Sequence, residues 1–124
     1  MTDHRTQNRP APAPSLTEAI DRLADELDDV HRHKSGTVVE YVRGTTVFAV
    51  RQGAIASFRL RPEIAEAALR TADTVRSSRG AGWITLQWRV VDGFTLDRAL
   101  AWFESAWRLA GEAPDGRPAP PRPN

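Results

Sequence analysis

The sequence predicts an α+β domain in which an antiparallel four-stranded sheet carries helices on one face. Segments of alternating apolar and polar residues, typical of half-buried strands, fill the middle of the chain. Segments with apolar residues at helical spacing lie on both sides of this region and once within it. The expected element order is α-β-β-β-α-β-α, a meander followed by one returning strand.

The first helix is predicted over residues 16–30. Ser15 and Glu18 have the spacing of a capping box, and apolar residues recur at helical intervals after them. The outer face of this helix is acidic, because residues 15–30 contain six acids and one arginine. The basic run at residues 31–34 is interpreted as the helix C-terminus, with Gly36 as the stop signal.

Three strands are predicted next, over residues 37–43, 45–51 and 54–61, and a tight turn at Gln52-Gly53 joins the last two. Pro62 opens a short helix over residues 62–72, and residues 73–82 form a loop. A fourth strand runs over residues 83–91. Thr95 is the expected N-cap of the last helix, which ends at Gly111.

The domain is expected to span residues 15–111, between two disordered tails at residues 1–14 and 112–124. Both tails are rich in proline and poor in large apolar residues. No stretch approaches the roughly 18 apolar residues of a membrane span, and residues 1–14 lack the apolar region of a signal peptide. Together with the absence of cysteine, these features predict a cytoplasmic protein without a membrane partner. The composition, rich in arginine and alanine, is typical of high-GC bacteria.

The residues assign no catalytic, metal or cofactor site. Ser57 and Thr85 are expected on one side of the sheet, but the pattern places no base beside them. His31 and His33 lack the further ligands that a metal site needs. The glycines at residues 80–82 precede a strand, not the helix N-terminus that would hold a phosphate. An enzyme, or a small-molecule pocket between the sheet and the last helix, therefore remains an alternative to a binding module.

Arginines suggest a nucleic-acid contact surface. Residues 43–89 contain eight arginines and three acids. Strand alternation places four of these arginines and one aromatic residue on the sheet face away from the core, where they could track a phosphate backbone and stack a base. This predicted site consists of Arg51, Arg59, Arg61, Trp83 and Arg89. The same pattern is explained by solvated arginines that the acidic helix neutralises, and the net charge of +1 gives no overall attraction to a polyanion.

The same sheet face is expected to be unusually apolar, which supports a different hypothesis. Val47, Ala49 and Ile55 share it with Trp83 by alternation, and Trp102 lies at the edge of the last helix's apolar stripe. Exposed apolar patches are typical of protein contact sites. A protein-interaction or self-associating domain that uses Val47, Ile55, Trp83 and Trp102 is therefore the main alternative.

A family resemblance covers about residues 38–110. The order of several short segments resembles the MmcQ/YjbR-like family. These segments are Phe48-Ala49-Val50, the run from Phe58 through Arg61 into Pro62-Glu63, Leu69-Arg70, Trp83 and the final segment 102–108. This resemblance implies a CyaY-like α+β domain, for which DNA binding has been proposed because the fold is similar to a double-wing motif. Residues 44–48 and 82–84 resemble, more weakly, the small luciferase-like domains.

Overall fold

Three glycine turns fold the first part of the chain into a meander. The computed structural model describes residues 15–88 and 92–112. Two-residue turns that begin at Gly36, Gly44 and Gly53 join four strands, and each of these glycines has a φ close to +60°. Glycine at the first turn position is what a type II′ hairpin requires. The strands are β1 (Val30–Ser35), β2 (Val38–Arg43), β3 (Thr46–Gln52) and β4 (Ile55–Arg59).

Two later strands extend the sheet beyond β4. β6 (Trp83–Gln87) pairs with β4, and β5 (Thr74–Arg76) pairs with the other side of β6. The sheet order is β1-β2-β3-β4-β6-β5, and all neighbouring strands are antiparallel. The predicted α+β class is therefore confirmed, but the prediction of four strands is wrong because the described residues form six.

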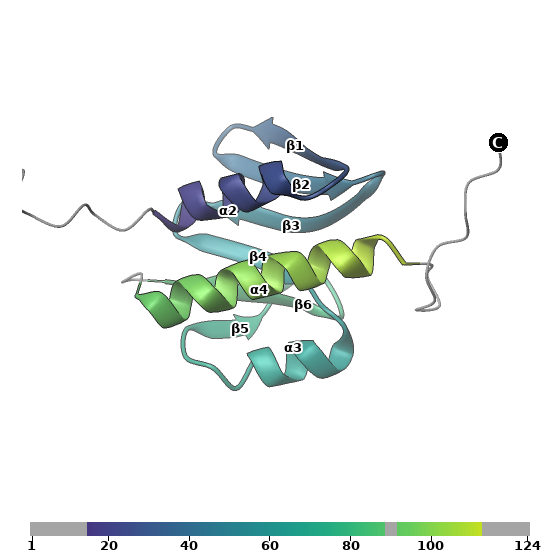
Figure 1. Ribbon diagram of the computed structural model, residues 1–124. Coiled ribbons are helices and arrows are strands. Elements are labelled where there is room, and N and C mark those ends of the chain that lie inside the picture. Colours follow the sequence, from purple (N-terminus) through teal and green to yellow (C-terminus); the bar gives the residue numbers. More distant parts are fainter. Residues whose placement is uncertain (1–14, 89–91, 113–124) are drawn as a thin grey trace, which may run out of the picture.

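The helices lie on one side of the sheet (Figure 1). α2 (Leu16–Glu26) and α4 (Gly93–Ala110) run side by side over it, and α3 (Pro62–Ala68) packs near β6. The capping box predicted at Ser15 and Glu18 is present. The predicted N-cap of the last helix is one turn too late, because Asp92 is the N-cap and its carboxylate accepts the Thr95 N–H at 2.8 Å.

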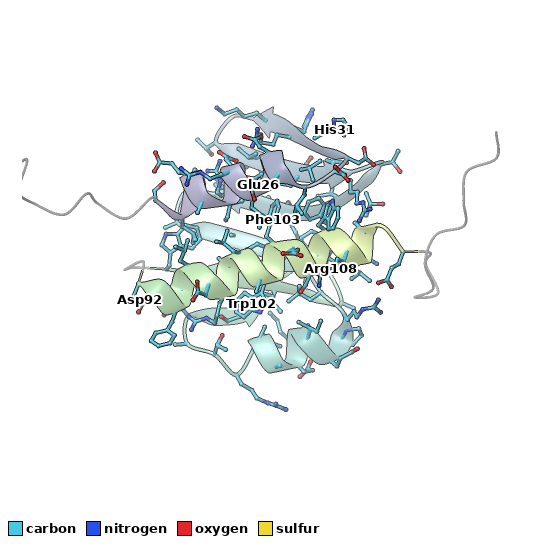
Figure 2. All side chains as sticks on the ribbon, viewed as in Figure 1. Glu26, His31, Asp92, Trp102, Phe103 and Arg108 are labelled. Atoms are coloured by element: carbon cyan, nitrogen blue, oxygen red, sulfur yellow. The ribbon has the colours of Figure 1, made fainter. Side chains whose placement is uncertain are left out.

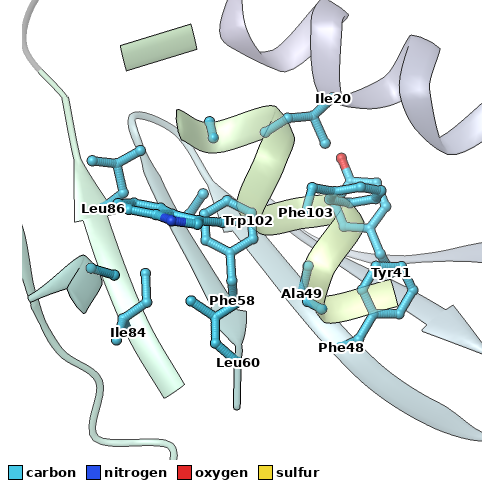
Figure 3. Packing of buried hydrophobic residues seen from close by; sticks show 14 of the residues in the cluster. Ile20, Tyr41, Phe48, Ala49, Phe58, Leu60, Ile84, Leu86, Trp102 and Phe103 are labelled. Atoms are coloured by element: carbon cyan, nitrogen blue, oxygen red, sulfur yellow. The ribbon is translucent and has the colours of Figure 1, made fainter. Parts of the chain in front are cut away.

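The core fills the space between these helices and the sheet (Figure 3). Phe103 on α4 packs edge-on against Tyr41 and Phe48, with ring centroids 5.0 and 5.1 Å away. Trp102 meets Phe58 in the same way at 6.2 Å. Trp102 is thus a core residue, 8% exposed, and the expectation that it contributes to a surface contact is wrong.

The two strands that the sequence analysis does not predict lie at the sheet edges. β1 contains the basic run at residues 31–34, which is predicted to be a helix end, whereas α2 stops at Glu26. β5 lies within the segment predicted as a loop, and α3 ends at Ala68, four residues before its predicted end. These edge strands present few apolar residues to the core, so hydrophobic alternation gives them no signal.

Several predictions fall on residues 1–14, 89–91 and 113–124, which lie outside the described residues. They are the two disordered tails and the end of the fourth predicted strand. Glu112, assigned to the C-terminal tail, is described and pairs with Arg61. No helix in residues 15–88 and 92–112 is both long and apolar enough to cross a membrane.

Candidate functional site

A β-bulge in β3 decides which side chains share a sheet face. The register passes from Tyr41 opposite Ala49 to Val42 opposite Val47, so Phe48 is the extra residue. Phe48 and Ala49 both belong to the core as a result. The bulge reverses the alternation for the rest of β3, because one inserted residue exchanges the two faces.

Arg51 lies on the helix-covered face because of this reversal, and its predicted place on the opposite face is wrong. Its partner across the strands is Ala56, a core residue. Its Nε donates to the Tyr41 hydroxyl at 3.1 Å, and its Nη2 lies 3.8 Å from the Asp21 carboxylate of α2. The side chain is 14% exposed. Arg51 therefore connects the sheet to α2 and is not available to a ligand on the other face.

The remaining residues of the predicted arginine site are also divided. Arg61 pairs with Glu112, just after α4, and Arg89 lies outside the described residues. Arg59 and Trp83 are direct cross-strand partners on the face without helices. The structure thus brings together two of the five predicted residues.

Tyr41 and its partners form a polar cluster between the layers. The Tyr41 hydroxyl donates to Asp21 Oδ1 at 2.8 Å while it accepts from Arg51. Arg32 on β1 contacts both Asp21 and Asp25. Burial raises the pKa of Tyr41 to about 12, and the hydrogen bonds with Arg51 and Asp21 act on it in opposite directions. These groups satisfy one another and attach α2 to the sheet.

The sheet face opposite the helices, called here the uncovered face, is defined by the register of the six strands. None of its residues belongs to the core cluster or is among the partly buried residues packed against that cluster. The residues assigned to it by cross-strand pairing are His31, His33 and Ser35 of β1; Val38, Glu40 and Val42 of β2; Val47, Val50 and Gln52 of β3; Ile55, Ser57 and Arg59 of β4; Val75 of β5; and Trp83, Thr85 and Gln87 of β6.

Pairing aligns these residues in rows across the sheet. The central row runs His33, Glu40, Val50, Ser57, Thr85 and Val75. One flanking row runs Ser35, Val38, Gln52, Ile55 and Gln87, and the other has His31, Val42 and Val47 together with the Arg59–Trp83 pair.

The middle of the uncovered face is closely packed and its margins are open. Val50 and Ser57 are each 8% exposed, whereas Ile55 and Val75 are 42% and 51% exposed. Seven of the sixteen assigned residues are large apolar or aromatic side chains, namely Val38, Val42, Val47, Val50, Ile55, Val75 and Trp83. Apart from the two histidines, the ionisable residues among the sixteen are Glu40, which is acidic, and Arg59, which is basic. Nearly half of this face is therefore large apolar or aromatic side chains, and its charge is close to neutral.

The uncovered face does not present a hydrolase-like set of groups. Ser57 and Thr85 do share it, as predicted, and their hydroxyl oxygens lie 2.9 Å apart. His31 and His33 lie on β1, three strands away from Ser57, and Figure 2 shows His31 at that outer edge of the sheet. At about 4.8 Å per strand this separation is near 14 Å, which is too long for a proton transfer.

A hollow of about 330 Å³ lies between α3 and the β5–β6 turn, not between the sheet and α4 as the small-molecule alternative expects. It is lined by residues that include Pro62, Ala65 and Trp83, and the Glu66–Arg76 ion pair lies beside it. Within residues 15–88 and 92–112, no group of three or more His, Cys, Asp or Glu side chains is arranged to hold a metal ion.

Comparisons with known proteins add no relative. No protein-family model, no curated protein and no solved structure matches the chain. The resemblance to the MmcQ/YjbR-like family accordingly stays a prediction, and the function is argued from the geometry alone.

Sequence reasoning finds Val47, Ile55 and Trp83 on this face but misses Val38, Val42, Val50 and Val75. Alternation continued through the bulge places Val50 on the same face as Phe48 and Ala49 on the outer face, and the register reverses both faces, although Val50 is still only 8% exposed. Phe48, Ala49 and Val50 are consecutive apolar residues, so hydrophobicity alone does not show which of them face the core. Arg51 misleads in the same direction, because alternation favours a solvent face for its long polar side chain whereas it lies on the helix-covered face.

Proposed function

We propose that the protein is a non-enzymatic protein-interaction domain that binds its partner through the uncovered face. The observation that carries the proposal is that this face holds the cross-strand pair Val42–Val47 together with Val38, Val50, Ile55 and Trp83, with no described helix over them. Contiguous apolar patches on soluble domains typically mark contact sites. The reason is that the free energy falls when a partner removes apolar surface from water.

The charge distribution favours a protein over a nucleic acid. A nucleic-acid surface needs several cations that can reach phosphates together. Arg51 and Arg61 instead pair with Asp21 and Glu112 on the helix side, and Arg43 stacks on Trp107 of α4 with its guanidinium 4.0 Å from the ring centroid. Two arginines lie next to Trp83: Arg59 is its cross-strand partner, and Arg79 lies 5.4 Å from its ring. The nucleic-acid hypothesis therefore rests on fewer arginines than the sequence predicts.

Site-specific photocrosslinking tests the proposal for a protein partner of any identity. A photoreactive amino acid is placed at Ile55, on the uncovered face, and in a second variant at Ala101, an exposed residue of α4. Both variants are irradiated in extract of the cells that produce the protein. We expect discrete protein adducts from position 55 and few or none from position 101.

The position dependence and the nature of the adducts decide the outcome. Equal adducts at both positions, or none at position 55, would contradict the proposal. Adducts at position 55 that disappear on nuclease treatment would show a nucleic-acid partner instead. Substitution of Val50 by threonine, which keeps its shape but adds a hydroxyl, should lower the adduct yield at position 55 because it makes the face more polar.

A further inference from the structure

The partner that best fits the uncovered face is another copy of the same chain. We infer that two copies associate face to face about a two-fold axis that runs along β3, an inference that rests on the proposed function. In such an arrangement the same patch serves both subunits, so it must be complementary to itself. The charges, the sheet edges and the size of the face each support this geometry.

The two charges on the face are placed for reciprocal pairing. Glu40 lies on β2 and Arg59 on β4, the two neighbours of β3. A two-fold axis along β3 in the plane between the sheets places β2 of each copy over β4 of the other. Glu40 of one copy is then about 7 Å along the strand from Arg59 of the other, across sheets packed about 10 Å apart. The two side chains together can span this distance, and the pair forms twice.

An axis perpendicular to the strands gives no such pairing. It would place β2 over β2 and β4 over β4, so that Glu40 faces the strand that carries the other Glu40, and the Arg59 of the other copy lies two strands, about 10 Å, to the side. Like charges brought together at an interface are unfavourable. The positions of Glu40 and Arg59 therefore favour the axis along β3 over the axis perpendicular to the strands.

Association by the sheet edges is disfavoured. β1 forms one edge and contains His31, Arg32, His33 and Lys34, while β5 forms the other edge and is three residues long. Charged and very short edge strands are the means by which sheet proteins avoid edge-to-edge pairing. Contact between faces remains as the way to remove Val47, Ile55 and Trp83 from water.

The chain's own terminal segments are poor candidates to cover the face. Residues 1–14 contain Met1 as their one large apolar side chain, and residues 113–124 contain none larger than proline. These compositions cannot supply the apolar surface that would match Val47, Val50 and Ile55. A second copy supplies the same valines, Ile55 and Trp83.

The size of the face predicts a reversible dimer. Six strands at about 4.8 Å and three rows at about 7 Å give a flat footprint of about 600 Å². Stable interfaces bury about 800 Å² of accessible surface on each partner. The accessible surface of a face is larger than its flat footprint, because it includes the sides of the protruding side chains. Most of the face must therefore be used, and dissociation at about micromolar concentration is expected.

Sedimentation equilibrium of the purified full-length chain tests the inference. The mass is measured from about 1 to about 500 μM, a range that brackets the expected dissociation constant, for the parent, Glu40→Arg, Arg59→Glu and the double variant. We expect the parent to pass from 13.7 kDa to twice that mass. Each single reversal should weaken the dimer about tenfold or more, and the double reversal should restore it because opposite charges face each other again.

A matched control and a second type of variant keep the test interpretable. Glu26→Arg changes the charge in the same way on the exposed end of α2 and should leave the dimer unchanged. Ile55→Asp places a charge at an exposed margin of the face and should abolish the dimer without unfolding the domain. Circular dichroism of each variant verifies that it is folded.

The outcomes separate this inference from the proposed function. A parent chain that stays monomeric throughout, while position 55 still forms adducts with another protein, would overturn the second copy as partner and leave the interaction domain standing. Adducts from position 55 to the chain's own terminal residues would overturn it as well. A dimer that is unaffected by both single reversals and by Ile55→Asp would show that a different surface associates.

Discussion

Tyr41 shows how much of the fold depends on single polar contacts that the sequence does not reveal. It is 1% exposed, and its hydroxyl lies between Asp21 on α2 and Arg51 on β3. A buried hydroxyl without partners would be costly, so these two hydrogen bonds are a condition for placing tyrosine in this core. No local pattern in the sequence identifies these partners, which are 20 and 10 residues away from Tyr41.

The ionisation of Tyr41 gives a direct prediction about pH. Burial raises its pKa to about 12 in the folded protein, above the value of 10.0 expected in the unfolded chain. The contribution to stability is therefore complete below pH 10 and is lost as the pH rises towards 12, at up to about 1.4 kcal/mol per pH unit. Tyr41 is the single tyrosine of the chain, so ultraviolet absorbance of the phenolate reports it alone.

A spectroscopic midpoint near pH 12 in the folded protein is expected, together with a fall in the denaturant midpoint between pH 10 and 12. Tyr41→Phe should remove that part of the fall and cost about 1 kcal/mol at pH 8, where the lost hydrogen bonds are what matters. A phenolate midpoint near pH 10 before unfolding would show that the hydroxyl is not buried as described.

At the scale of elements, the sequence predicts what hydrophobic patterns encode and misses what backbone geometry decides. The central strands, α2 and α4 are predicted because their apolar residues recur at the spacing of the element. β1 is missed because His31, Arg32, His33 and Lys34 have no strand-like pattern, and they form a strand because the Gly36 turn folds them against β2. The bulge at Phe48 is missed because Phe48, Ala49 and Val50 are all apolar, so alternation does not show which of them face the helices.

Gly82 illustrates a backbone requirement that can be tested. Its φ is +82°, and a Cβ at this position would lie 2.7 Å from the Leu60 carbonyl oxygen. Its own carbonyl accepts the Leu60 N–H at 2.8 Å, which joins the end of β4 to the start of β6. Gly82→Ala should therefore destabilise the domain through both backbone strain and a clash with rigid main-chain atoms.

Gly53→Ala is the matched control, because Gly53 also has a positive φ but no atom lies within 4 Å of the added Cβ. The strain common to both is about 1–2 kcal/mol. Urea unfolding should show Gly82→Ala to be at least about 1 kcal/mol less stable than Gly53→Ala. Equal losses for the two variants would mean that the chain relaxes around residue 82 without cost.

For the whole molecule, the separation of charge along the chain is largely cancelled in space. The acidic first helix and the arginines of residues 43–89 have opposite charge in the sequence, and neutralisation by the helix is one of the two interpretations of that pattern. The structure supports it for Arg51, which contacts Asp21, whereas Arg61 and Arg76 pair with Glu112 and Glu66 outside that helix. The sequence could not show which arginines are paired, because their acidic partners come from other parts of the fold.

This cancellation implies that the two layers are attached more strongly through Asp21 than through its neighbour Asp25. Asp21 contacts Tyr41, Arg32 and Arg51, and Arg51 is mostly buried. Asp25 contacts Arg32 alone and has a 66% exposed side chain. Asp21→Ala should cost about 2 kcal/mol because a shielded guanidinium loses its carboxylate, whereas Asp25→Ala should cost less than about 1 kcal/mol.

Salt distinguishes these two contributions in the same unfolding experiment. The effect of Asp25→Ala should shrink when the ionic strength is raised to about 1 M, where the screening length is about 3 Å, because water and ions reach that pair freely. The effect of Asp21→Ala should persist, since the Tyr41 hydrogen bond and the shielded Arg51 respond weakly to salt. If both effects disappeared together, α2 would be held to the sheet by its apolar face alone, and the charge pattern of the chain would matter for solubility rather than for the fold.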